Sequence, residues 1–158
     1  MKLILTFILV ISLFSCVEKE YEYEIVPVTV GPEGGSKTTP KQTSEFISIA
    51  YADLFGTSIP QPELLKLSVA YASFGDLKLI EDRIIRNFLN DPSVIIPSQP
   101  SVNGDTTAFI VNTYLKFYNR EPNEFEKYFW LNSFREDSLL TPHTAYYAMM
   151  TSDEYRFY

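Results

Sequence analysis

The sequence predicts an all-α protein, in which two tandem three-helix units pack as one small helical domain behind a disordered tether. From residue 43 to residue 158, apolar side chains recur every three or four positions, and the alternation of a half-buried strand is essentially absent. Cap residues, prolines and glycines divide this stretch into short helical segments. The aromatic pattern of the first half also returns 63 positions later, as for Phe46 and Phe109. We therefore expect a six-helix domain over 43–158, with halves 43–92 and 105–158.

The N-terminal residues have the layout of a secretory signal peptide. Lys2 precedes an apolar run from Leu3 to Leu13, and Cys16, the one cysteine of the chain, follows shortly after. The run is shorter than the ~20 apolar residues that cross a bilayer, and it is apolar all round, unlike an amphipathic core helix. The sequence Leu13-Phe14-Ser15-Cys16 resembles the lipobox of bacterial lipoproteins. That resemblance implies that residues 1–15 are removed and that Cys16 carries fatty-acyl chains, palmitate among them, which anchor the protein in a membrane.

Residues 16–42 are predicted to be the lipidated cysteine followed by a flexible acidic, proline- and glycine-rich tether. From Gly31 to Gln42 there is no apolar residue to bury besides proline and glycine, so the entropy lost on ordering is not offset. The stretch VEKEYEYE at 17–24 is similar to the acidic export signals of surface lipoproteins of Bacteroidota, and a solvated spacer is the alternative. The resemblance implies an outer-membrane protein that faces the periplasm or the cell surface. A net charge of −7 disfavours nucleic acid as a partner.

The first two helices are predicted from their apolar spacing and from the residues that bound them. One helix covers about residues 44–55 and stops at Gly56, because glycine commonly ends helices. The next begins near Pro60 or Pro62, since proline is tolerated in a first turn, and it ends at Gly75.

The third helix has the clearest amphipathic pattern in the chain. Asp76 caps its start, and Asp91-Pro92 ends it because the residue before a proline disfavours helical geometry. Its apolar stripe consists of Leu77, Ile80, Ile84 and Phe88. Residues 93–104, rich in proline and ending in Asn-Gly, are predicted to be a linker.

Three further helices and a last short turn are predicted in the second half, because cap signals mark where each begins. A short polar side chain accepts hydrogen bonds from the first-turn N–H groups, and a Glu three positions later completes a capping box. These signals are Asp105 for a helix to about Asn119, Asn123 with Glu126, Thr141 with Pro142, and Thr151 with Glu154.

Similarity between the two halves predicts an internal duplication. The pairs 63 positions apart are Phe46-Ile47 with Phe109-Ile110, Tyr51 with Tyr114, Leu54-Phe55 with Phe117-Tyr118, and Glu63 with Glu126. With small gaps, Phe74 aligns with Phe134, and Phe88-Leu89 aligns with Met149-Met150. Three helices in about fifty residues are marginal alone, so we expect the halves to pack together. The alternative is that two helical trios share aromatic residues by chance.

The second half is also similar to small helical modules of unknown function that recur in bacterial surface and secreted proteins. The residues that carry the resemblance are Tyr114, Phe117-Tyr118, Arg120, Pro122, Glu126, Trp130, Leu140 with Pro142, and Ser152-Asp153-Glu154-Tyr155. The resemblance implies a scaffold or surface-interaction role, with no active site to carry over. Independently, we predict that Arg120 and Glu154 form a structural ion pair or cap.

No pattern in the chain indicates an enzyme, a cofactor or a metal site. The one histidine, His143, lies in the first turn of a helix and is predicted to be a satisfied surface residue, which leaves Ser–His–Asp and Cys–His catalysis without a base. One histidine and one cysteine do not make a zinc site. Two alternatives remain open: a calcium site at Glu121, Glu124 and Glu126, and a pair of carboxylates for glycoside hydrolysis.

The fifth predicted helix carries aromatic residues on both faces. At 100° per residue, Phe125, Tyr128 and Phe129 share one face, and Trp130, Leu131 and Phe134 share the opposite face. Such a helix is either central in the fold or presents its second face to a partner. We expect Phe125 and Phe129 in the core. The candidate partner-binding residues are Trp130, Leu131, Phe134, Tyr155, Phe157 and Tyr158.

The predicted function is therefore that of a membrane-anchored, non-catalytic lipoprotein, an interaction or accessory subunit of a cell-envelope complex with a protein partner. The alternative is a surface carbohydrate- or ligand-binding lipoprotein that uses exposed aromatic residues, Trp130 and the tyrosines, as stacking platforms.

Overall fold

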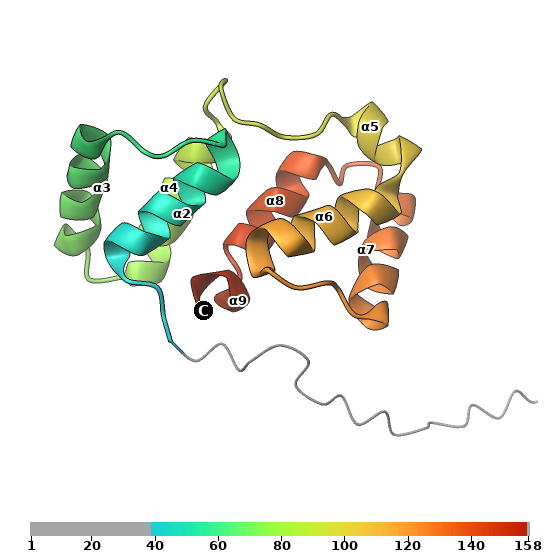
Figure 1. Cartoon of the computed structure of the whole chain (residues 1–158). Coiled ribbons are helices and arrows are strands. Elements are labelled where there is room, and N and C mark those ends of the chain that lie inside the picture. The colour runs from blue at the N-terminus through green and yellow to red at the C-terminus, as the bar shows by residue number, and fades with distance from the viewer. Residues whose placement is uncertain (1–38, 158) are drawn as a thin grey trace, which may run out of the picture. The chain divides into compact units, whose positions relative to one another are not determined.

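The computed structural model describes residues 39–157 of the chain (Figure 1). Residues 1–38 and Tyr158 lie outside the described residues, so the predicted signal peptide, the lipidation of Cys16 and most of the predicted tether stay predictions. The described part is all-α, as predicted, and none of its helices has the length and apolar character needed to cross a membrane. Its helices are α2 (Thr43–Phe55), α3 (Gln61–Ser73), α4 (Leu77–Leu89), α5 (Gln99–Gly104), α6 (Thr106–Tyr118), α7 (Glu124–Glu136), α8 (Pro142–Met150) and α9 (Asp153–Arg156).

Local capping explains where most of these helices begin. Four predicted cap side chains accept a hydrogen bond from the backbone N–H three residues later: Asp76, Asp105, Asn123 and Thr141. α3 follows Pro60, and Pro62 stands in its first turn, where a missing N–H costs nothing. These starts confirm the sequence prediction.

Two boundaries differ from the prediction. Ser152, and not Thr151, caps α9: the Ser152 hydroxyl accepts from the N–H of Tyr155, whereas Thr151 ends α8. The segment predicted as a plain linker contains the short helix α5, because Ser98 caps it and Pro100 fits its first turn.

The two halves repeat each other in structure. α2 and α6 have 13 residues each and begin 63 positions apart, and the same holds for α3 and α7. Gly56 and Asn119, which follow α2 and α6, both adopt left-handed geometry, with φ of 68° and 54°. Equivalent positions are also buried together: Phe46 and Phe109, Ile47 and Ile110, Ala50 and Thr113, Leu54 and Phe117.

The structural alignment corrects one predicted pair. Because α3 and α7 match without a gap, the counterpart of Phe134 is Tyr71, which is buried. Phe74 lies beyond the end of α3 and is 48% exposed. The predicted match of the ends of α4 and α8 holds, since Leu89 and Met150 are both buried last residues of their helices.

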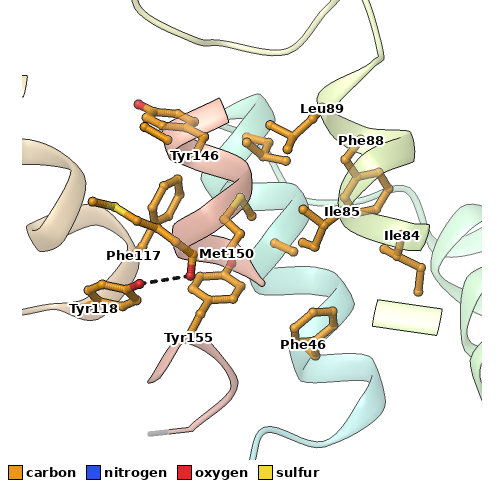
Figure 2. Packing of buried hydrophobic residues seen from close by; sticks show 14 of the residues in the cluster. Phe46, Ile84, Ile85, Phe88, Leu89, Phe117, Tyr118, Tyr146, Met150 and Tyr155 are labelled. Atoms are coloured by element: carbon orange, nitrogen blue, oxygen red, sulfur yellow. Dashed lines mark hydrogen bonds between the residues drawn. The ribbon is translucent and has the colours of Figure 1, made fainter. Parts of the chain in front are cut away.

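The two halves share one core. α4 packs against α8, its counterpart in the other half. Between the halves lies Tyr155 of α9, fully buried, with its ring edge-on to Phe46 of α2 at 6.0 Å and to Phe117 of α6 at 5.8 Å (Figure 2). The Tyr155 hydroxyl donates to a carboxylate oxygen of Asp53 on α2 at 2.7 Å. The short last helix thus joins the two repeats.

The beginning of the domain is held by its last described residues. Pro40 and Phe157 form an isolated antiparallel bridge, and the N–H of Lys41 donates to the carbonyl of Arg156 at 2.9 Å. The Lys41 ammonium donates to the carbonyl of Tyr155 and lies 4.2 Å from the centre of its ring.

Candidate interaction surface

α7 lies at the edge of the domain, with α6 as its main neighbour (Figure 1). None of its residues is fully buried. Its inner side faces α6: the indole N–H of Trp130 donates to the Tyr114 hydroxyl at 3.3 Å, and Phe134 meets Phe109 edge-on at 5.6 Å. The Trp130 side of the helix is therefore its packing side.

The outer side of α7 presents three exposed aromatic residues, Phe125, Tyr128 and Phe129, which we call the aromatic face of α7. Their exposed fractions are 77%, 67% and 53%. The prediction that Phe125 and Phe129 lie in the core is wrong. Trp130, a candidate partner-binding residue that could equally belong to the core, lies on the packing side. The helix is also not sandwiched between the halves, because the central place belongs to α4 and α8.

Arg120, in the loop after α6, fixes the orientation of α7. Its guanidinium donates to both carboxylate oxygens of Glu126 at 2.8 and 2.6 Å, and to both of Glu154 at 2.7 and 2.8 Å. It also lies over the rings of Tyr114 and Tyr118, 5.2 and 5.8 Å from their centres. Because Glu126 is one turn from Trp130, this contact turns the Trp130 side inward. The predicted ion pair of Arg120 with Glu154 is confirmed, and Glu126 joins it.

The electrostatics of this cluster favour its charged form. Hydrogen bonds to Glu126 and Glu154 raise the pKa of Arg120 above its usual value. Burial opposes ionisation of Glu126, but hydrogen bonds from Arg120 and from the Asn123 backbone outweigh it, so the pKa of Glu126 is lowered. Burial raises the pKa of Tyr118 to about 12. The cluster is an ionic contact that ties the first turn of α7 to the loop after α6 and to α9.

The other candidate contact residues take different places. Tyr155 is fully buried, which contradicts its assignment as a partner-binding residue, and Trp130 and Phe134 pack against the core. Phe157 is partly buried in the bridge with Pro40. Leu131 is 36% exposed beside the aromatic face. Leu131 is therefore the most exposed of the predicted partner-binding residues that the structure describes.

The histidine and the glutamates that could have formed a catalytic or metal site have structural partners. His143 lies at the surface, and its Nε2 donates to the carbonyl of Leu89 at 3.2 Å, as predicted for a satisfied histidine. The calcium alternative finds no support, because Glu126 binds Arg120, and Glu124 pairs with Lys127 at 2.7 Å. Within residues 39–157, no group of three or more His, Cys, Asp or Glu side chains is arranged to hold a metal ion.

A buried polar cluster around Glu81 was not predicted from the sequence. Glu81 on α4 is 9% exposed, accepts a hydrogen bond from the Tyr71 hydroxyl at 2.5 Å, and lies 3.5 Å from the guanidinium of Arg156. Burial, followed by the contact with Glu81, raises the pKa of Tyr71 to about 12. The sequence did contain a signal: Glu81 stands one turn from Leu77, on the apolar stripe of its helix.

No family model, curated protein or solved structure matches this chain. The lipobox and the module resemblance of the second half therefore remain predictions from the residues alone.

Proposed function

We propose that this protein is a membrane-anchored, non-catalytic lipoprotein whose helical domain serves as an interaction subunit of a cell-envelope complex. The observation that carries the proposal is the aromatic face of α7. Three aromatic side chains on adjacent turns are more than half exposed, although tyrosine and phenylalanine normally gain free energy by burial. Contiguous exposed apolar patches of this kind mark sites of protein contact.

The contacts that hold α7 in place support a binding role. Arg120 and Trp130 hold the inner side of the helix, so the aromatic face keeps its position without a partner. A preorganised surface loses less conformational entropy on binding, and tyrosine is enriched among the residues that dominate binding energy.

The acidic residues near the aromatic face favour a partner with a basic surface. Glu121 and Glu124 flank the aromatic face at its N-terminal end, where the Glu124 side chain is 91% exposed and pairs with Lys127, and the whole chain has a net charge of −7. The complementary surface is an apolar helix or groove of an envelope protein with basic residues around it. Lipid attachment at Cys16, which rests on the lipobox, would keep the domain close to such a partner.

Site-specific photo-crosslinking in cells tests the proposal. A benzophenone amino acid placed at Tyr128 is expected to give one discrete adduct with an envelope protein. The matched control is Leu65, which is 64% exposed and occupies the equivalent position of α3 in the first half. The adduct should disappear when Phe125→Ser is added, with an unchanged melting temperature.

Other outcomes would redirect the proposal. Equal adducts at Tyr128 and Leu65, or an adduct that survives Phe125→Ser, would show that the aromatic face is not the contact. Retention on an envelope polysaccharide that depends on Tyr128 would support the ligand-binding alternative instead.

A further inference from the structure

We propose that a hollow in the first half, between α2, α3 and α4, is a guanidinium-binding site that takes the arginine side chain of a protein partner. The hollow has a volume of about 630 Å³. Its lining includes Tyr51, Phe55, Ser93, the acidic residues Glu63 and Asp91, and one cationic residue, Lys66. It lies in the opposite half from the aromatic face of α7 and is a separate site.

The internal duplication identifies the ligand. The offset of 63 relates α2 with α3 to α6 with α7, and an offset of 61 relates the end of α4 to the end of α8. Under these offsets, four lining residues of the hollow correspond to four residues of the second half. The pairs are Tyr51 with Tyr114, Phe55 with Tyr118, Glu63 with Glu126, and Ser93 with Glu154. Those four residues surround the guanidinium of Arg120 in the second half. The hollow is thus the place where the other repeat holds an arginine.

The alignment continues beyond the ends of α4 and α8. Asn90 and Thr151, which follow these helices, have nearly the same backbone, with φ and ψ of −86° and −3° against −92° and 0°. The next residue donates back in the same way in both halves, from Asp91 to Phe88 at 3.1 Å and from Ser152 to Met149 at 3.2 Å. The turn that carries Ser93 therefore follows the path of the turn that carries Glu154.

The first half retains the surroundings of the arginine but not the arginine. The counterpart of Arg120 is Thr57, which has no cationic group. Tyr51 and Phe55 line the hollow with their rings stacked on each other at 4.3 Å, and the outer face of an aromatic ring is a surface over which a cation binds.

The carboxylate of Glu63 is available to an incoming cation. Lys66 lies 3.9 Å from it, at the outer limit of an ion pair, whereas Arg120 reaches Glu126 at 2.6 Å. The Lys66 side chain is 77% exposed, so it can turn aside into solvent. Asp91 adds a second carboxylate to the hollow, although Ser93 already donates to it.

A guanidinium suits this lining better than an ammonium does. A guanidinium is planar, stacks on aromatic rings and binds a carboxylate through two parallel hydrogen bonds, whereas an ammonium is a compact, strongly hydrated charge. The combination of Tyr51, Phe55 and Glu63 supplies one stacking wall and one carboxylate.

Titration with a small probe, followed by NMR of the full chain in detergent, tests the site. N-acetyl-arginine-methylamide should shift the amide signals of Tyr51, Phe55, Glu63 and Ser93 and saturate at a Kd of about a millimolar. The citrulline analogue, which has the same shape and no charge, should leave them in place. Glu63→Gln should weaken binding about tenfold, and Glu136→Gln, an exposed carboxylate 3.8 Å from Arg135, should not.

A built-in arginine gives an independent test. Thr57→Arg should place its guanidinium in the hollow, because Gly56 and Asn119 give the preceding chain the same turn. The melting temperature should then rise by about 2–4 °C, and binding of the arginine probe should be lost. Thr57→Gln, with a long uncharged side chain, should do neither.

The same measurements show what would overturn the proposal. An equal response to the citrulline probe, shifts scattered over the surface, or unchanged probe binding by Thr57→Arg would exclude a guanidinium site. A helical peptide that presents one arginine should bind more tightly than the free probe, and equal affinity would assign the site to a free guanidinium compound. The photo-crosslink at Tyr128 depends on α7 alone, so the two proposals fail separately.

Discussion

Asp53 is an acidic residue whose carboxyl group is partly buried, which disfavours its charged form. Its carboxylate accepts a hydrogen bond from the hydroxyl of Tyr155, the residue that joins the two repeats. Burial raises the pKa of Asp53, and the Tyr155 hydrogen bond and the charges of Lys116 and Lys41 offset only part of that effect. The folded state therefore disfavours the ionised form. The carboxylate costs stability at neutral pH, and the cost disappears as the pH falls through the raised pKa.

Asp53→Asn should raise the melting temperature at pH 7 by about 2–4 °C, because the amide oxygen still accepts from Tyr155 while the charge is gone. The advantage over the natural protein should shrink as the pH is lowered toward 4, where Asp53 becomes protonated. Thermal melts of both proteins across this range measure it. A lower melting temperature for Asp53→Asn at every pH would mean that the contacts of the charge outweigh its burial.

Single residues were predictable where a local motif marked them. Arg120 and Glu154 were predicted to form a structural ion pair or cap, and the structure has the ion pair. The pairing of Tyr71 with Glu81 was not, because it depends on how α3 lies against α4. Contacts between helices depend on how the helices pack, and short-range sequence patterns do not show which distant side chains meet.

At the scale of the helices, the residue at which a helix begins was predicted better than the side of the helix that is buried. Caps such as Asp76 and Asn123 act on backbone within three residues, so the sequence shows them directly. The direction in which α7 points is different, because both of its faces are aromatic. The contact of Glu126 with Arg120 decides it, and that contact closes only in the folded domain.

Adjacent substitutions in α7 separate its two faces. Trp130→Ala should lower the free energy of unfolding by about 2 kcal/mol, since a partly buried indole loses its packing and its bond to Tyr114. Phe129→Ala, on the exposed side, should change it by less than about 0.5 kcal/mol. Urea unfolding of the two proteins makes the comparison. A larger loss for Phe129→Ala would mean that the aromatic face packs inside the domain.

At the scale of the whole molecule, the duplication was visible in the sequence because core positions recur at one spacing. The repeat predicted that the halves pack together, and α4 against α8 with Tyr155 between the halves is how they do so. The role of α9 was not visible, since a four-residue helix carries too little pattern to reveal that its tyrosine is central.

The membrane anchor also belongs to this scale. Metabolic labelling with an alkyne fatty acid should mark the natural protein and not Cys16→Ser, because the thiol is the acceptor in a lipobox. Detergent partitioning of the two proteins provides a second readout. Equal labelling of both would remove the lipid anchor from the proposed function.

The bridge between Pro40 and Phe157 has a mechanical consequence. A pulling force on the chain ahead of Pro40 reaches the domain first through Lys41, whose N–H and ammonium are bound to Arg156 and Tyr155. Tyr155 is fully buried between both repeats, so these contacts tie the chain just before α2 to the shared core. Tension should therefore be shared between α2 and the C-terminal residues, and we expect the domain to resist being peeled open from its first helix alone.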